Sequence, residues 1–454
     1  MENFHGSEFN LKLEKTMKKY FVYIASAVLM MAACAKEDIN TPVETPVVGE
    51  TELITVELNA ATKTALDGTN TKWSAGDAVS VNFGGTSIGT LTLVEGNTFS
   101  GKITKGKSGA ATLTYPAGVT AVPTTQVAVA GSFANGAALL EGETTIENLR
   151  AEIGTELQNK TALLEFSVAK AGDVTFEVGS TKYTVTGCQT GKTYYACVAP
   201  ASNVSFVARI GGYLSKKASS NKTFTVGKIA DLGVLPAPEK STIELRGEAP
   251  LSWDSGTQFY KDVDCCVLKN VSLASNQGFK IVNSGKWLQG NIGSGKWAVL
   301  KEKGNNMTTS TGQYDIYVSN TGKVLKVVSA GSPSPEVIKP ESDYMYLLPS
   351  DNWLESSAHF VAWLWKDSGS GKVYNFSEHP DVSGLYRVKL NGANKMILFR
   401  LPSNITYGDA STTWPGDKTN WYKTGDLSIS NKNLYTVVNW HESGSGLSNV
   451  TTLL

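Results

Sequence analysis

The chain has 454 residues, and its 41 Lys and Arg residues are balanced by 41 Asp and Glu residues. This balance, without a dense basic cluster, excludes the electrostatic footprint of a nucleic-acid-binding protein. At about 150 residues per domain the length predicts roughly three domains. Gly, Thr and Val are plentiful and no long apolar repeat has helical spacing, which predicts an all-β fold.

The N-terminal segment has the features of an export signal. Two lysines follow Met17, and the apolar run at 20–33 is too short to span a bilayer and ends in small residues. The run ends in "MAAC", which resembles a bacterial lipobox and implies that Cys34 is acylated and becomes the mature N-terminus. Several acyl chains, palmitate among them, give stable anchoring. We therefore expect 1–33 to be an overlong start followed by a lipoprotein signal peptide; the alternative is an ordinary secretory signal with an incidental Cys.

The residues after Cys34 point to the cell surface. Lys36, Glu37 and Asp38 resemble the charged tag that directs lipoproteins of gut anaerobes to the outer face of the outer membrane. The Pro-containing stretch that follows has no apolar periodicity, so 34–50 is predicted to be the lipidated Cys and a tether. The expected location is the outer membrane, with the chain held by lipid and facing the extracellular side.

Proline-rich joints divide the rest of the chain. They lie at 235–241 and 329–343, where the sequences "LPAPEKS" and "SAGSPSPEVIKPESD" are typical of linkers between domains. The predicted domains are four β-sandwiches at 51–148, 149–238, 241–330 and 343–454.

The first two predicted sandwiches carry a resemblance. Alternating strands such as "VTFEVGSTKYTVTG" are accompanied, in order, by "KTALDGTNTKWSAGDAVSV", "TFSGKI", "TLTYPA", "KTYYACVAP" and "KIADLGVL". This order resembles the fimbrillin-like family of surface lipoproteins from about residue 51 to 235. The resemblance implies two tandem transthyretin-like sandwiches, divided near 147–152. It also implies structural roles for Trp73 in the core and for Gly76 and Asp77 in a turn.

The C-terminal half carries two further resemblances. The motifs "GFKI", "GNNM" and "GQYDIYVS" between 243 and 328 resemble the modules of starch-binding outer-membrane lipoproteins. The motifs "YLLPSDNWLESSAHFVAWLW", "GLYRVKL", "MILFRLP" and "WPGDKTNWYKTGDLSI" between 344 and 440 resemble a bacterial carbohydrate-binding module. Both imply β-sandwiches with aromatic glycan sites.

Tryptophan supplies the candidate binding residues. Nine of the 10 Trp follow residue 241, and "TTWPGDKTNWYKT" at 412–424 places aromatics among turn residues. An indole face covers the C–H face of a pyranose, and polar neighbours bind its hydroxyls. The predicted glycan-binding residues are Trp414, Trp421, Tyr422, Trp363, Trp365, Trp287 and Trp297.

Core packing is the competing interpretation for each aromatic residue. In "HFVAWLW", alternation places Phe360, Ala362 and Leu364 on one face and His359, Val361, Trp363 and Trp365 on the other, without saying which face is buried. We expect Trp353, Trp440, Trp253 and one of Trp363 and Trp365 to be structural. Trp287 and Trp297 follow matching Ser-Gly-Lys turns and form either a second platform or part of the core.

No catalytic or cofactor motif is present in the sequence. The four His lack a neighbouring nucleophile motif and HExxH spacing, and the Cys residues lack zinc spacing, so we expect a protein without enzymatic activity, metal or cofactor. Cys188 and Cys197 flank a turn, and the sequence leaves open whether they form a disulfide. Adjacent Cys265 and Cys266 are expected on opposite faces of a strand.

The sequence as a whole predicts a non-catalytic cell-surface lipoprotein that binds polysaccharide or oligosaccharide. Its N-terminal pair of sandwiches would act as a stalk, and its C-terminal pair would hold the glycan, an α-glucan, for a neighbouring uptake system. The alternative is a fimbrillin-family structural adhesin or fimbria-associated subunit. A third reading is an accessory subunit that docks a transporter.

Overall fold

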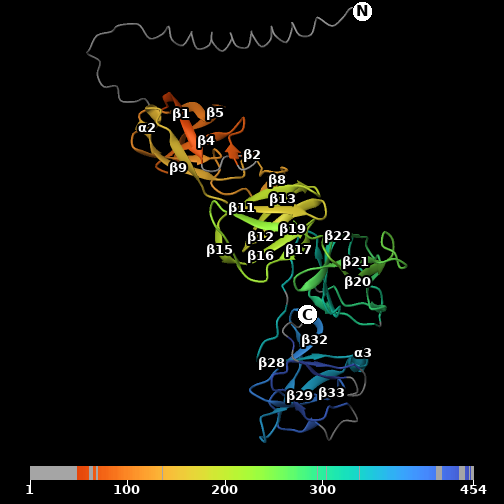
Figure 1. Cartoon of the computed structure of the whole chain (residues 1–454). Coiled ribbons are helices and arrows are strands. Elements are labelled where there is room, and N and C mark those ends of the chain that lie inside the picture. The colour runs from red at the N-terminus through yellow and green to blue at the C-terminus, as the bar shows by residue number, and fades with distance from the viewer. Residues whose placement is uncertain are drawn as a thin grey trace, which may run out of the picture.

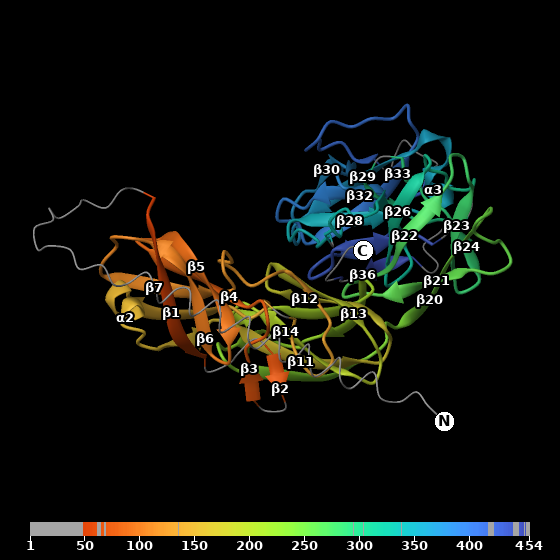
Figure 2. The same ribbon diagram turned by 90° about the horizontal axis from the view of Figure 1, so that it is seen from above.

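The computed structural model describes residues 49–60, 65–67, 70–134, 136–293, 295–302, 304–336, 338–415, 422–438, 445–448 and 450. Strands dominate this part of the chain, and its helices are α2 (Ile146–Arg150), α3 (Asp351–Leu354) and the 3-10 turn η1 (Glu355–Ser357). The all-β prediction is confirmed. Figure 1 shows β-units that follow one another along an elongated molecule, and Figure 2 shows the last two units lying together beyond the second.

The first unit is a closed barrel with the strand order β1-β10-β9-β7-β4-β5-β6. Closure leaves the sheet without an open edge. A small hairpin, β2 and β3, accompanies it. The strands are β1 (Thr51–Ala60), β2 (Ala65–Asp67), β3 (Asn70–Lys72), β4 (Ala78–Phe83), β5 (Thr86–Glu95), β6 (Thr98–Thr104), β7 (Ala110–Tyr115), β9 (Leu140–Thr145) and β10 (Thr155–Asn159).

Trp73 lies in the core of this barrel, as predicted. Its ring packs edge-on against Phe99 and Tyr115, with centroids 5.0 and 5.5 Å away, and its Nε1 donates to the Leu58 carbonyl at 3.1 Å. The turn at Gly76 and Asp77 is also present. Gly76 has a φ of +92°, and the Asp77 carboxylate accepts the Ser74 N–H at 2.7 Å. Trp73 and Asp77 are therefore structural residues.

The boundary between the first two units differs from the expected division near 147–152. Strand β10 follows α2 in sequence but returns to the barrel, where it pairs in parallel with β1. Strand β8 (Thr125–Val127) precedes α2 yet pairs with β13 (Thr181–Cys188) of the second unit. The alternation of residues along a strand does not determine which other strand it pairs with. The sequence therefore did not predict that β8 and β10 pair with strands of different units.

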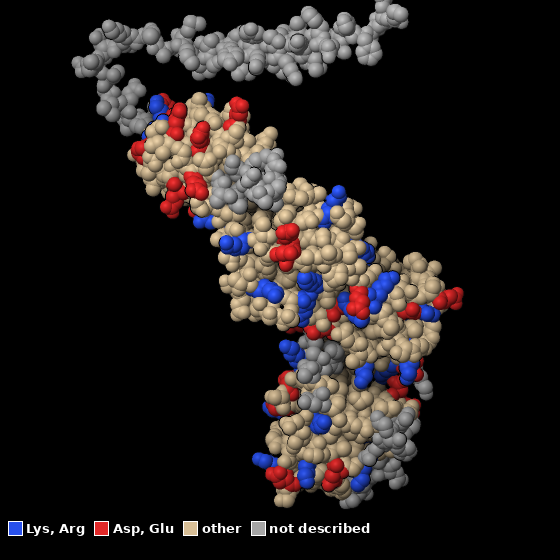
Figure 3. Space-filling model, viewed as in Figure 1, with Lys and Arg blue, Asp and Glu red and all other residues tan. Residues whose placement is uncertain are grey.

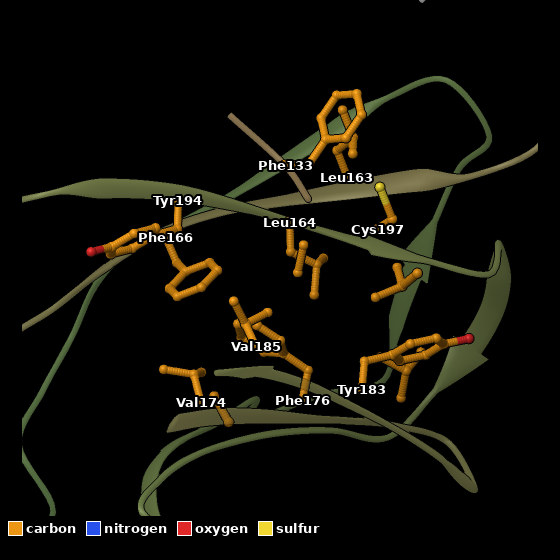
Figure 4. Close-up of a cluster of buried hydrophobic side chains, with 14 of the residues drawn as sticks. Phe133, Leu163, Leu164, Phe166, Val174, Phe176, Tyr183, Val185, Tyr194 and Cys197 are labelled. Carbon is orange, nitrogen blue, oxygen red and sulfur yellow. The ribbon is translucent and has the colours of Figure 1, made fainter. Parts of the chain in front are cut away.

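The second unit is a sandwich of two sheets, with orders β14-β11-β19 and β17-β16-β12-β13-β8, and a small sheet β15-β18 beside them. Figure 4 shows Leu164, Phe166 and Phe176 pointing into the space between the sheets. The strands are β11 (Ala162–Val168), β12 (Gly172–Val178), β13 (Thr181–Cys188), β14 (Thr193–Val198), β15 (Ala201–Val204), β16 (Phe206–Ile210), β17 (Tyr213–Lys217), β18 (Lys222–Phe224) and β19 (Ile229–Leu235).

Cys188 and Cys197 are free thiols in this core. They lie on β13 and β14, which belong to different sheets, so the two strands do not form the hairpin that a disulfide across the turn requires. Burial raises the pKa of Cys188 to about 11 and raises the pKa of Cys197 as well. Gln126 on β8 exchanges two hydrogen bonds with the Cys197 backbone, at 2.6 and 2.9 Å, and so joins the two sheets.

The third and fourth units share one sheet. Its order is β24-β23-β20-β21-β22-β26-β27-β25-β32-β28-β35-β36, with β31 paired to β32. The third unit contributes β20 (Lys240–Gly247), β21 (Thr257–Lys261), β22 (Cys265–Leu273), β23 (Phe279–Asn283), β24 (Lys286–Leu288), β25 (Trp297–Val299), β26 (Gly312–Ser319) and β27 (Val324–Ser329). The fourth contributes β28 (Tyr344–Leu348), β31 (Ser377–His379), β32 (Val382–Lys389), β35 (Leu434–Thr436) and β36 (Gly446–Ser448).

The contact between these two units is made by backbone pairing and by a common apolar cluster. Strand β25 pairs in parallel with β32, with Trp297 opposite Val382. The cluster contains Trp297 and Tyr317 from the third unit and Tyr346 and Leu434 from the fourth. Two separable sandwiches were expected on either side of the Pro-rich stretch, but this arrangement joins them into one packed body.

A second sheet of the fourth unit positions the candidate site. It has the order β30-β29-β33-β34, with β29 (His359–Trp365), β30 (Lys372–Asn375), β33 (Lys395–Leu401) and β34 (Leu427–Ser428). Trp353 packs beneath it, 4% exposed and stacked on Phe360 with centroids 5.9 Å apart. The structural role predicted for Trp353 is confirmed. Cys265 and Cys266 also point to opposite clusters, as alternation on a strand predicts.

Candidate functional site

The two faces of β29 have different environments. Phe360, Ala362 and Leu364 are buried in the main core of the fourth unit, between its two sheets. Val361, Trp363 and Trp365 lie on the opposite face, where Val361 is buried and both tryptophans are half-buried. Because the strand has apolar residues on both faces, its outer face needs a cover of its own.

The cover is the loop at 402–415, which follows β33. Ile405, Tyr407 and Trp414 of this loop pack on the apolar residues of the outer face. The Trp414 ring meets Trp363 and Phe399 edge-on, with centroids 5.1 and 5.3 Å away. Trp363, Trp365, Tyr407 and Trp414 together form the outer aromatic cluster, whose tryptophans are neither fully buried nor fully exposed.

Polar groups hold the loop in place beside this cluster. The Asn375 Nδ2 donates to the Tyr407 carbonyl at 2.9 Å and to Asp409 Oδ1 at 2.8 Å. The Val373 N–H donates to the Ser411 carbonyl at 2.8 Å, which extends the sheet edge into the loop. The Lys423 ammonium lies 5.4 Å from the Trp414 ring centroid. The loop therefore presents its aromatic side chains from a fixed backbone.

Two buried polar atoms adjoin the cluster. Tyr407 Oη and His359 Nε2 are both buried and, among the described residues, neither has a hydrogen-bond partner. Burial lowers the pKa of His359, so its imidazole is neutral at neutral pH. Tyr407 was not among the predicted site residues. It lies in "NITYGDAST", where the surrounding turn residues indicate an aromatic residue in a loop.

Tyr422, which was predicted from the motif at 412–424, does not join this cluster. Tyr422 is half-buried and packs against the main core of the fourth unit, on the other side of the sheet from Trp414. Trp421 and Trp440 lie outside the described residues. Of the residues predicted at 412–424, the structure thus places Trp414 alone beside Trp363 and Trp365.

The predicted pair of Trp287 and Trp297 is not formed. Trp297 is 2% exposed and belongs to the cluster between the third and fourth units, which excludes it from a surface platform. Matching Ser-Gly-Lys turns gave the two residues similar sequence surroundings, but Trp297 begins a strand that is covered on both sides. The structure corrects this part of the prediction.

Trp287 is instead paired with Trp253. Trp287 is 37% exposed, and the two ring centroids are 5.9 Å apart. The Arg246 guanidinium lies 5.4 Å from the Trp287 ring centroid and donates to the Trp253 carbonyl at 3.1 Å. Trp253 was expected to be structural, and it is half-buried beside this second aromatic surface.

A shallow hollow of about 570 Å³ adjoins Arg246 on this surface. Arg246 is held by Glu244, with Nη2 and Oε2 2.7 Å apart, and Tyr260 also lines the hollow. The hollow thus combines two cations, a carboxylate, an amide and hydroxyl groups. Its lining residues are Lys240, Glu244, Arg246, Ser255, Gly256, Thr257, Gln258 and Tyr260.

The described residues lack the side-chain arrangements of two other kinds of site. No group of three or more His, Cys, Asp or Glu there is arranged to hold a metal ion. No helix within the described ranges combines the length and apolarity needed to cross a bilayer. On the face shown in Figure 3, basic and acidic side chains are interspersed. The predicted lipidation residue, Cys34, lies outside the described residues.

Comparison with known proteins gives structural relatives only. No family model matches the chain, and no curated protein matches it. It is similar to a proposed cell-adhesion protein from Bacteroides uniformis, with 14% identity and a TM-score of 0.24, over 46% of this chain and 97% of the other. A fimbrial protein from Bacteroides ovatus has 11% identity and a TM-score of 0.24, over 48% of this chain and 57% of its own.

A proposed cell-adhesion protein from Bacteroides thetaiotaomicron has 11% identity and a TM-score of 0.22, over 39% of this chain and 92% of the other. The chain therefore has structural similarity to Bacteroides cell-adhesion and fimbrial proteins over about half of its length.

Proposed function

We propose that the chain is a non-catalytic cell-surface binding protein whose C-terminal units hold a carbohydrate. The outer aromatic cluster carries this proposal. Trp363 and Trp365 stand on a strand that is paired on both sides, and Trp414 is packed edge-on against Trp363. An indole that is half-exposed on a rigid sheet can cover the C–H face of a sugar ring without losing conformational freedom on binding.

Polar groups next to the cluster would orient the sugar. Lys423 is exposed beside Trp414, and Asp409 is exposed in the middle of the loop at 402–415. An ammonium group donates hydrogen bonds and a carboxylate accepts them. A sugar hydroxyl can therefore accept a hydrogen bond from Lys423 or donate one to Asp409. The second aromatic surface, at Trp253 and Trp287, repeats this combination with Arg246 and Glu244.

The N-terminal units would then act as a stalk, with the acylated Cys34 as its membrane anchor at the extracellular face of the outer membrane. Replacement of Cys34 by Ser should release the protein into a soluble fraction. A Cys34→Ser variant that still partitions with detergent like the parent would contradict the anchor.

A second candidate is a structural adhesin or fimbria-associated subunit that uses its aromatic surfaces to bind protein. The firm connection between successive units favours it, because a shared sheet at β25 and β32 resists separation under load. Docking to a transporter for glycan uptake is a further use of the same surfaces. Identifying the ligand of the outer aromatic cluster, a glycan or a protein, would distinguish between these functions.

The test is a glycan array, followed by affinity-gel retardation on immobilised α-glucan, with the soluble fragment 35–454, which lacks the acylated Cys34. Trp414→Ala should weaken glycan binding by more than tenfold, since the loss of one aromatic anchor commonly costs about 2 kcal/mol. Trp414→Phe should retain part of the binding. Trp353→Phe, in the core, is the control for general packing damage. Wild-type binding by a folded Trp414→Ala variant would move the proposal to the adhesin.

A further inference from the structure

A cleft of about 420 Å³ lies where the third and fourth units meet. Small-molecule sites commonly occupy about 300 to 1,000 Å³ and are often found between domains. Lys301 and Glu302 belong to the wall from the third unit, and Asp351 and Asn352 belong to the wall from the fourth. Because the two units share the sheet through β25 and β32, both walls are held in a fixed relation.

The walls are apolar below and polar at the rim. Leu288, Val299, Leu300, Leu348 and Val437 supply the apolar surface. At the rim, Lys301 and Asp351 form an ion pair across the two units, with Nζ and Oδ1 3.4 Å apart.

Charges along the rim are balanced. Lys323 and Lys301 are matched by Glu302 and Asp351, so the lining carries no net charge. Such a lining offers both hydrogen-bond donors and hydrogen-bond acceptors. It suits an uncharged ligand with many hydroxyl groups better than a cation or an anion.

Ser350 adds a polar atom that is not used within the described part of the chain. It lines the cleft and stands at the N-cap position of α3, yet its side chain makes no capping hydrogen bond. Its Oγ is buried and has no hydrogen-bond partner among the described residues. A buried hydroxyl without a partner is unfavourable, and a ligand hydroxyl in the cleft would satisfy it.

We infer that this cleft binds a neutral, sugar-sized polyol, such as the end of an uncharged oligosaccharide. The C–H groups of the ligand would lie on the leucine and valine wall, and its hydroxyls would bond to Ser350, Asn352 and the Lys301–Asp351 pair. This site is separate from the outer aromatic cluster and does not depend on the function proposed for that cluster.

The inference is tested with the soluble fragment 35–454 and four probes: maltose, cellobiose and lactose as neutral disaccharides, and glucuronic acid as a charged comparator. Val438 lines the cleft and is 52% exposed, so Val438→Trp should fill its mouth without disturbing the core. We expect calorimetry to show at least one neutral disaccharide binding to the parent and at least tenfold weaker binding to Val438→Trp. Val234→Trp places the same side chain at a position that is 63% exposed on the second unit, away from the cleft, and as the matched control it should bind like the parent.

Ser350→Ala tests the buried hydroxyl separately. Loss of one hydrogen bond to the ligand should weaken binding about fivefold, while the melting temperature stays equal or rises because an unpaired buried group has been removed. An unchanged affinity in a folded Ser350→Ala variant would overturn the role of this residue.

The two sites are distinguished by crossing the variants. Disaccharide binding that is lost in Trp414→Ala but intact in Val438→Trp would overturn the cleft and leave the aromatic cluster standing. Binding that is lost in Val438→Trp and intact in Trp414→Ala would support the cleft, whether or not the aromatic cluster binds polysaccharide. Binding of glucuronic acid alone, or of no probe at all, would overturn the inference.

Discussion

Arg209 Nη1 lies 2.8 Å from Asp262 Oδ2, and this ion pair joins the second unit to the third. Both side chains are largely buried, at 14% and 8% exposure, and Arg209 Nε is also 3.0 Å from Glu177 of its own sheet. The Asp262 carboxylate, opposing the effect of burial, raises the pKa of Arg209. Next to it, Tyr213 packs on Tyr260 with centroids 4.1 Å apart and accepts the Lys269 N–H at 3.1 Å.

Loss of this ion pair should therefore destabilise the junction. Asp262→Asn removes the charge that faces Arg209 but leaves Glu177 as a partner, so we expect a loss of about 2 kcal/mol in the free energy of unfolding. Chemical denaturation with urea would measure it. Lys261→Ala is the matched control, because its ion pair with Glu239 is exposed and should contribute less than about 1 kcal/mol. Equal effects for both variants would contradict a buried junction.

The two Pro-rich stretches should differ in their sensitivity to proteases. Near the first, Pro238 is buried and the Pro236 carbonyl accepts the Ser215 hydroxyl at 2.7 Å. The second, at 330–336, is largely exposed and contains no strand. Since proteases cut exposed backbone that can adapt to their active sites, a broad-specificity protease should cleave first at the second stretch.

The fragments of that cleavage should remain together. Strand β25 stays paired with β32, and the cluster around Trp297 stays buried, whether or not the connecting stretch is intact. The nicked protein should co-elute on size exclusion and separate only on a denaturing gel. Dissociation of the fragments without denaturant would mean that the third and fourth units do not share a sheet in solution.

Two tryptophans that follow similar turns should respond differently to replacement. Trp297→Ala leaves a cavity in the cluster between units and should cost about 3–5 kcal/mol in the free energy of unfolding. Trp287→Ala removes a side chain that is 37% exposed and should cost about 1 kcal/mol, chiefly its contact with Trp253. Urea denaturation of both variants gives the comparison, and a larger cost for Trp287→Ala would contradict the structure.

Stability should fall as the pH is lowered from 7.5 to 5.5. His379 is 3% exposed, and its burial is the main reason why its pKa lies below the ordinary 6.5. The positive charges of Arg387 and Lys296 lower this pKa further. The negative charges of Asp381 and Glu341 raise it, but by less. The unfolded chain therefore takes up a proton below about pH 6.5 that folded His379 does not accept. The stability associated with neutral His379 is fully present above that pH and is lost as the pH falls toward the folded pKa.

The pH effect can be assigned with a variant that keeps the local hydrogen bond. His379 Nδ1 accepts the Asp381 N–H at 3.1 Å, and the side-chain oxygen of Asn can take that position. His379→Asn should show a smaller loss of stability between pH 7.5 and 5.5 than the parent, measured as the change in urea midpoint. His359, whose pKa is also lowered by burial, should account for part of the remaining slope. An identical slope in parent and variant would rule out His379.

Several features followed from the sequence alone. Composition and the lack of helical spacing predicted the all-β fold, and the family resemblance implied the core position of Trp73; both are confirmed. Alternation predicted the opposite faces of Cys265 and Cys266, which is confirmed because strand geometry fixes it locally. Alternation also divided β29 correctly into the face of Phe360 and the face of Trp363.

Tertiary structure decided which strands pair and which aromatic residues reach the surface. The sequence around Trp297 resembles that around Trp287, yet pairing of β25 with β32 buries one and leaves the other exposed. In the same way, β8 pairs with a strand of the second unit, whereas β10, which follows it in sequence, pairs with a strand of the first. The loop at 402–415 folds back over Trp363 and brings Trp414 beside it. These outcomes depend on contacts between residues far apart in the chain, and local periodicity carries no information about the partner of a strand or the cover of a face.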